Sequence, residues 1–131
     1  MARLAHTMIR ILDEARSLAF YETAFGLKVV ERAEFDAFVL IYLRDAEQAF
    51  ELELTVIKDR KEPWAHGESY GHMAVTVDDL DAEHARLTAA GVQLKPIREL
   101  MLGDRLFARY CFVTDPDGYK IEVLERSGRF G

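Results

Sequence analysis

The stretch His6-Thr-Met-Ile-Arg-Ile-Leu-Asp13 has a counterpart later in the chain, His72-Met-Ala-Val-Thr-Val-Asp-Asp79. The two histidines are 66 positions apart, and so are the two closing aspartates. Both stretches are strand-like, and each is followed by a helix-like segment. The chain therefore contains an internal duplication, and this duplication decides the fold.

The repeat predicts one helix in each half, at residues 14–25 and 80–90. An aspartate before each segment can cap the helix by accepting hydrogen bonds from its free N–H groups, and a glycine after it suits a left-handed stop. The capping residues are Asp13 and Asp79 at the starts and Gly26 and Gly91 at the ends. The two halves thus share their helix signals as well as their first strand.

Three further strands follow the helix in each half. They are predicted at 28–33, 38–43 and 50–56, and at 92–97, 106–113 and 119–124. The turn Asp45-Ala-Glu-Gln mirrors Asp115-Pro-Asp-Gly, whose proline and glycine are strong turn formers. Each half is therefore βαβββ. We expect an α+β protein of one domain, 1–131, built of modules 1–57 and 70–126 joined by the linker 58–69.

Two histidines and two glutamates stand at equivalent positions in the modules, namely His6, Glu53, His72 and Glu122. Because strand side chains alternate between faces, all four are predicted on the face that carries no helix. The repeat symmetry would gather them around one axis. Two imidazoles and two carboxylates suit Ni²⁺, Co²⁺, Zn²⁺, Fe²⁺ or Mn²⁺, and the lack of thiolates argues against a structural zinc site. The sequence therefore predicts a catalytic metal centre.

The composition excludes several other functions. A net charge of −6 and a pI near 5.2 argue against nucleic-acid binding, which needs a clustered positive field. The sequence has no long apolar run for a membrane span and no signal-peptide core, so we expect a cytoplasmic protein without membrane contact. The single Cys111 lies in an apolar run and is expected to be a buried small hydrophobe rather than a nucleophile.

Five segments resemble glyoxalase I, or lactoylglutathione lyase, of the vicinal oxygen chelate superfamily. They occur in the family's order along almost the whole chain, and the last two are the most specific. The segments are His6-Thr-Met-Ile-Arg10, Ser17-Leu-Ala-Phe-Tyr21 with Phe25-Gly-Leu, Glu53-Leu-Thr55, Tyr70-Gly-His-Met-Ala-Val75 and Asp115-Pro-Asp-Gly-Tyr-Lys-Ile-Glu122. The resemblance implies that the paired modules curl into an eight-stranded open barrel-like sheet.

The resemblance also implies an activity. The family isomerises the hemithioacetal of methylglyoxal and glutathione to S-lactoylglutathione by proton transfer through a metal-bound enediolate. The equivalents of His6, Glu53, His72 and Glu122 ligate its metal, for which nickel is our first choice and cobalt or zinc the alternatives. Glu122 is the better candidate for the base, with Glu53 able to move the proton on the opposite side. Family members are usually homodimers with sites built across the subunit interface.

Substrate recognition matches the family less closely. Arg10 matches a position that contacts a glutathione carboxylate, and Lys95 falls near a basic position of the substrate loop, where a surface role is an equal alternative. Three features depart from the family pattern: Val56-Ile-Lys58 replaces an Asn-containing segment, Glu68 replaces an Arg of some members, and 99–106 replaces a Gly-rich loop. Another thiol or aldehyde adduct is therefore an alternative substrate.

Two other classes of function compete with this interpretation. One is a different superfamily enzyme, namely an acyl-CoA epimerase, a dioxygenase or a thiol transferase. The dioxygenases and transferases normally use two His and one Glu, so a coordinating Glu53 favours the isomerase. The other is a metal-free drug-binding protein, which would keep the repeat but generally lack the complete set of four ligands.

Overall fold

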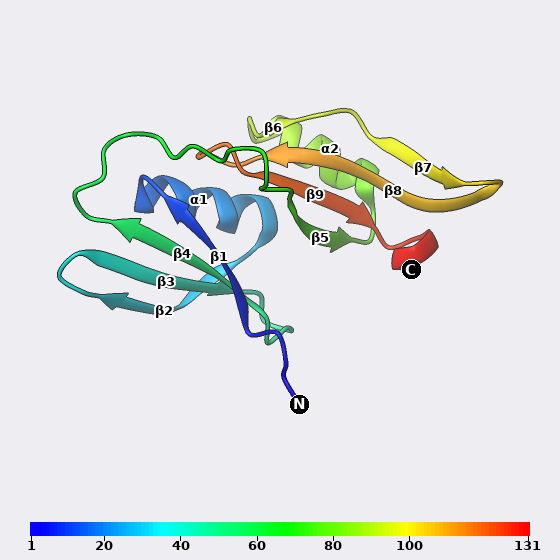
Figure 1. Cartoon of the computed structure of the whole chain (residues 1–131). Coiled ribbons are helices and arrows are strands. Elements are labelled where there is room, and N and C mark those ends of the chain that lie inside the picture. The colour runs from blue at the N-terminus through cyan, green and yellow to red at the C-terminus, as the bar shows by residue number, and fades with distance from the viewer. The chain divides into compact units, whose positions relative to one another are not determined.

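The computed structural model describes all residues, 1–131, as two compact units, Met1–Ala65 and His66–Gly131. Each unit contains one sheet and one α-helix (Figure 1). The boundary between the units falls inside the predicted linker 58–69. That the two modules act as one domain stays a prediction.

The first unit contains a four-stranded sheet in the order β1-β4-β3-β2. Strands β1 and β4 are parallel, whereas β3 is antiparallel to both β2 and β4. The elements are β1 His6–Ile11, α1 Glu14–Phe25, β2 Lys28–Glu34, β3 Phe38–Arg44 and β4 Glu51–Ile57.

The second unit repeats this topology with one addition. Its sheet has the order β5-β9-β8-β6, and β7 pairs with β8 beside β6. The β5 and β9 strands are parallel, as are β1 and β4. The elements are β5 Met73–Val77, α2 Leu80–Ala89, β6 Gln93–Leu94, β7 Arg98–Leu102, β8 Arg105–Thr114, β9 Lys120–Glu125 and the 3₁₀ helix η1 Gly128–Phe130. The predicted α+β fold of two βαβββ modules is confirmed.

Each helix starts and stops for the predicted reasons. The Asp13 carboxylate accepts a hydrogen bond from the Arg16 N–H at 2.9 Å, and Asp79 accepts one from the Ala82 N–H at 3.0 Å. The glycine after each helix has a positive φ, 68° at Gly26 and 77° at Gly91. Both caps satisfy backbone groups that the helix cannot pair internally.

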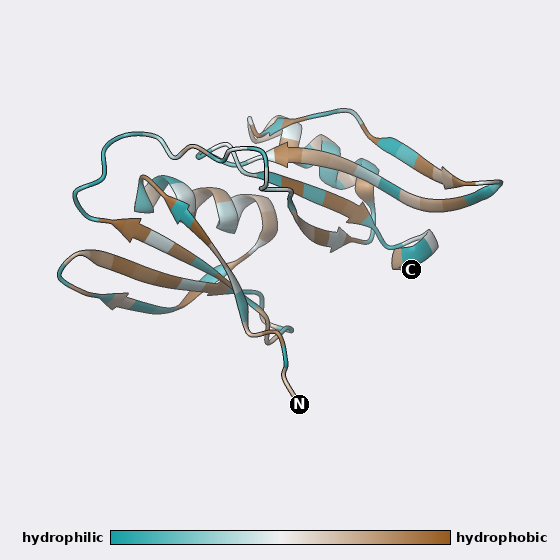
Figure 2. Ribbon diagram, viewed as in Figure 1, coloured by the Kyte–Doolittle hydropathy of each residue, from teal (hydrophilic) through white to brown (hydrophobic).

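The core of each unit lies on one face of its sheet. In the first unit, Leu54 on β4 pairs with Ile9 on β1 and with Ile41 on β3, and all three side chains are buried. In the second unit, Val123 on β9 is the buried partner of Cys111 on β8. Figure 2 shows the same alternation as hydrophobic and hydrophilic bands along the strands. Burial of these rows fixes strand register, because a one-residue slip would turn every side chain to the other face.

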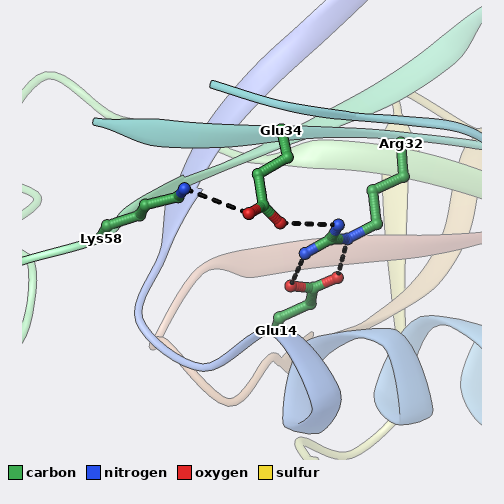
Figure 3. A network of polar contacts seen from close by, with 4 residues as sticks. All are labelled: Glu14, Arg32, Glu34 and Lys58. Carbon is green, nitrogen blue, oxygen red and sulfur yellow. Dashed lines mark hydrogen bonds and ion pairs between the residues drawn. The ribbon is translucent and has the colours of Figure 1, made fainter. Parts of the chain in front are cut away.

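An exposed network of charges joins α1 to β2 in the first unit (Figure 3). Arg32 binds both carboxylate oxygens of Glu14, at 2.6 and 3.0 Å, and also contacts Glu34 at 3.0 Å. Lys58 contacts the other oxygen of Glu34 at 3.2 Å, and hydrogen bonds from Lys58 and then Arg32 lower the pKa of that carboxyl. The network links α1 with β2, although exposed pairs contribute little stability.

The structure corrects the sequence prediction between residues 92 and 106. The expected strand at 92–97 is only the two-residue β6, and the segment 99–106, interpreted as a loop, is largely the hairpin of β7 and β8. Pro96 has no N–H to donate to β8 and separates β6 from β7, which lie along the same edge of that strand. The chain accordingly has nine strands in two open sheets rather than eight.

The turn Gly103-Asp104 could have revealed this hairpin. It joins the paired residues Leu102 and Arg105, and Gly103 has a φ of 64°. A two-residue turn that begins with glycine is a known hairpin signal.

The chain has no helix with the length and apolar character needed to cross a membrane.

Candidate metal centre

His6 and Glu53 lie together on neighbouring parallel strands of the first unit. Glu53 on β4 is the register partner of Met8, two residues beyond His6 on β1, so the His6 and Glu53 side chains share a face. Their Nε2 and Oε2 atoms are 2.8 Å apart. The Glu53 side chain is 10% exposed and that of His6 is 42% exposed, so the carboxylate lies beneath an accessible imidazole.

His72 and Glu122 repeat this arrangement in the second unit. His72 directly precedes β5, and Glu122 on β9 is the register partner of Ala74, again two residues beyond the histidine. The His72 Nε2 and Glu122 Oε1 atoms are 3.6 Å apart, which is ion-pair range rather than hydrogen-bond range. The second pair therefore has the same strand register as the first, but its imidazole nitrogen and carboxylate oxygen are farther apart.

The structure thus brings the four predicted ligands together as two pairs, one in each unit. Within the structure, no three His, Cys, Asp or Glu side chains form a group that could hold a metal ion. Each pair offers one imidazole nitrogen and one carboxylate oxygen, and both are ordinary ligands of divalent transition metals. The donor chemistry fits such an ion, and the gathering of all four around one ion stays a prediction.

An aromatic ring accompanies each pair, which the sequence analysis missed. Tyr42 on β3 is the cross-strand partner of Glu53, and its ring centroid lies 5.9 Å from that of His6. Phe112 on β8 is the cross-strand partner of Glu122, and its ring centroid lies 5.1 Å from that of His72. Both contacts are edge-on, with interplanar angles of 77°. Of the two rings, only that of Tyr42 carries a hydroxyl group that could donate a hydrogen bond to the neighbouring glutamate.

Tyr42 and Glu53 stand opposite each other on neighbouring strands, so the hydroxyl and the carboxylate lie on the same face of the sheet. The pKa of Tyr42 is raised first by burial, and then by the negative charge of Glu53 and by hydrogen bonding to it. A raised pKa means that the phenol remains protonated at neutral pH and can act as a hydrogen-bond donor.

Arg10, the predicted substrate contact, lies on β1 next to a tryptophan. Its guanidinium carbon is 5.9 Å from the centroid of the Trp64 ring, and that of Arg60 is 4.0 Å from it. Arg60 also donates hydrogen bonds to the carbonyls of Glu62 and Pro63, at 2.6 and 2.8 Å. Arg60 therefore holds the segment around Trp64 in place, and Arg10 lies beside the Trp64 ring.

Lys95 and the remaining histidines have structural contacts. The Lys95 N–H donates to the Phe112 carbonyl, and the Lys95 carbonyl lies 3.0 Å from Nε2 of His84. His66 stacks on Tyr119, with ring centroids 4.1 Å apart and planes inclined by 12°. Neither histidine belongs to the predicted ligand set.

The Asp115-Pro-Asp-Gly turn determines where β9, the strand that carries Glu122, begins. The buried Asp115 carboxylate accepts hydrogen bonds from the N–H groups of Asp117 and Tyr119, at 2.9 and 2.8 Å. An aspartate that bonds its own following backbone is a common way to fix a tight turn. Asp115 thus starts β9 at a defined residue.

Cys111 is buried on β8, as predicted. Burial raises the pKa of its thiol to about 11, so the group remains a neutral thiol at physiological pH. A thiol in this state is a poor nucleophile and a poor metal ligand. Cysteine chemistry therefore has no part in the candidate site.

Comparison with known proteins agrees with the fold. The model of the Glyoxalase/Bleomycin resistance protein/Dioxygenase superfamily matches residues 3–123. The chain belongs to this superfamily.

The relatives of this chain indicate which type of enzyme it is within the superfamily. The lactoylglutathione lyase of Haemophilus influenzae is 35% identical over 94% of this chain and 92% of its own. That of Neisseria meningitidis serogroup A is 36% identical over 95% and 91%. The solved structure of the trypanothione-dependent glyoxalase I of Leishmania major is 32% identical, with a TM-score of 0.80 over 95% of this chain and 87% of its own. The protein is accordingly an enzyme, a carbon–sulfur lyase of the glyoxalase I type.

Proposed function

We propose that this protein binds one divalent metal ion through His6, Glu53, His72 and Glu122 and converts the methylglyoxal–glutathione hemithioacetal to S-lactoylglutathione. The observation that carries the proposal is the repeated His/Glu pair, found once in each unit with the same strand register. The names of the lactoylglutathione lyase relatives support the substrate. Nickel is the metal that we propose first, with cobalt or zinc as alternatives.

The reaction moves one proton between neighbouring carbons. A carboxylate removes the proton from C1 of the hemithioacetal, the electron pair moves to form an enediolate, and a proton returned to C2 gives the thioester. A divalent ion supplies the positive charge that stabilises negative oxygen in such reactions. The protein must therefore provide a base close to C1 and an acid close to C2.

Glu122 is the better candidate for the base that takes the C1 proton. Its carboxylate is 3.6 Å from the His72 nitrogen, whereas Glu53 is 2.8 Å from His6 and has the hydroxyl-bearing Tyr42 as its cross-strand partner. A carboxylate with fewer close partners has more freedom to turn toward a substrate. We assign Glu53 the second step, in which it moves a proton on the opposite side.

Arg10 is the candidate partner for a carboxylate of the substrate. Its exposed guanidinium borders Trp64, and it can bind a carboxylate through two parallel hydrogen bonds. Trp64 would provide a flat apolar wall beside the bound thiol. The homodimer with sites across its interface and the cytoplasmic location both stay predictions.

The proposal is tested by removing all metal and restoring Ni²⁺, Co²⁺ or Zn²⁺ separately before assaying thioester formation from methylglyoxal and glutathione. We expect turnover to depend on added metal and to rise by at least about 100-fold over the metal-free protein with the best ion. A parallel assay with trypanothione in place of glutathione identifies the thiol carrier. This second carrier is included because Glu68 is an exposed acid at a position where some family members have an arginine.

The matched control is Glu51→Gln. Glu51 lies on β4, on the same face as Glu53, and is the register partner of His6. Glu51→Gln removes one carboxylate of the same strand and keeps all four proposed ligands, so activity should be retained. Stoichiometric metal binding without turnover of either thiol adduct would contradict the proposed reaction.

A further inference from the structure

The two His/Glu pairs differ in the aromatic ring that lies beside them. Tyr42 stands opposite Glu53 and Phe112 stands opposite Glu122, at equivalent places in the duplicated modules. Both rings meet the histidine of their pair edge-on. The most direct chemical difference between these two settings is therefore one hydroxyl group.

That hydroxyl lies on the same face of the sheet as a carboxylate that is already confined. Glu53 is buried, its Oε2 atom is 2.8 Å from Nε2 of His6, and its cross-strand partner is Tyr42. A carboxylate has two oxygens, so it can hold a ligand with one and accept the tyrosine O–H with the other. Such a bond would fix the orientation of the carboxylate.

Glu122 lies in a different setting. Its cross-strand ring is a phenylalanine, and its Oε1 atom is 3.6 Å from Nε2 of His72. Its side chain is also more exposed, at 18% against 10% for Glu53. The second glutamate is therefore less constrained by its neighbours than the first.

We propose that Tyr42 is a positioning residue whose hydroxyl group holds Glu53 in place as a metal ligand and so makes the two glutamates unequal. Glu122 would then be the carboxylate that loosens first and accepts the C1 proton, while Glu53 would stay a ligand of the ion through that first step. This inference rests on the proposed function, because it assumes that both glutamates bind the ion. It explains the unequal roles of Glu53 and Glu122 by the aromatic residues that lie beside them.

The direct test is the affinity for Ni²⁺, measured by competition with a chromogenic chelator. Removing a hydrogen-bond partner of a metal ligand typically weakens binding by about 10- to 100-fold, and we expect about 10-fold for Tyr42→Phe. In a Glu53→Gln background, the same change should alter affinity by less than about 2-fold, since the carboxylate that Tyr42 orients is gone. An equal loss in both backgrounds would mean that Tyr42 acts by some other route and would overturn the inference.

Phe112→Tyr is the matched variant in the second unit. It places a hydroxyl group opposite Glu122 and should lower kcat without weakening the affinity for Ni²⁺. Tyr42→Phe should instead weaken metal binding before it affects kcat at saturating metal. If both variants changed kcat and affinity in the same ratio, the proposed division of roles between the glutamates would be wrong.

A metal-free measurement separates failure of this inference from failure of the proposed function. In the NMR spectrum of the apo-protein, Tyr42→Phe should shift the Glu53 carboxyl carbon signal and leave that of Glu122 unchanged. An unmoved Glu53 signal would overturn the contact itself. Normal metal binding by Tyr42→Phe would overturn its role and leave the proposed function standing, whereas a wild-type protein that binds no ion would contradict both.

Discussion

Glu122→Gln is expected to lower kcat for thioester formation by about 100- to 10,000-fold, the range that a positioned general base contributes. Glutamine keeps the size of the side chain and one oxygen, but it cannot accept a proton from carbon at neutral pH. Steady-state kinetics at saturating Ni²⁺, with the bound metal measured for each sample, separates loss of the base from loss of the ion.

The control for this variant is again Glu51→Gln, whose carboxylate shares the face of Glu53 on β4. It should keep kcat within about 2-fold of the wild type, because all four proposed ligands are still present. Full activity of metal-loaded Glu122→Gln would show that another group removes the C1 proton, and Glu53 would then be the first alternative.

Leu54→Ala is expected to reduce the free energy of unfolding by about 2 to 5 kcal/mol, as other large-to-small core substitutions do. Leu54 is fully buried and lies between Ile9 and Ile41 in the core row of the first unit. Its removal would leave a cavity beneath the strand that carries Glu53. Chemical denaturation monitored by circular dichroism gives the change directly.

Leu4→Ala is the matched control for the core variant. Leu4 belongs to the same unit but is exposed, so the same loss of atoms should change stability by no more than about 0.5 kcal/mol. A loss below about 1 kcal/mol for Leu54→Ala would mean that the site collapses around the smaller side chain, and the core row would matter less than its burial indicates.

The sequence predicted the repeated architecture because the repeat is expressed in local signals. Asp13 and Asp79 cap their helices through bonds that span three residues, and Gly26 supplies a left-handed conformation at one position. Such signals depend only on the nearby chain. The pairing of His6 with Glu53 was also predictable, since strand parity places both on one face.

The parts that could not be predicted depend on register and on single breaks in a strand. Tyr42 meets Glu53 only because the β3–β4 pairing places them opposite each other, and the loop between those strands differs in length from the one between β8 and β9. The two rings therefore lie at different sequence distances from their glutamates, and equal spacing along the sequence would not identify both of them. Similarly, the pattern of 92–97 is strand-like, but Pro96 removes one donor and divides it.

The central claim is that residues of both units bind a single ion. Titration of the apo-protein with Ni²⁺, for the wild type and for single substitutions of His6, Glu53, His72 and Glu122, tests it most directly. The account predicts one ion for each set of four ligands and a weaker affinity in all four variants, with Glu51→Gln unchanged. If substitutions in one unit abolished binding while those in the other left it intact, one pair would bind the ion alone and the four-ligand centre would be contradicted.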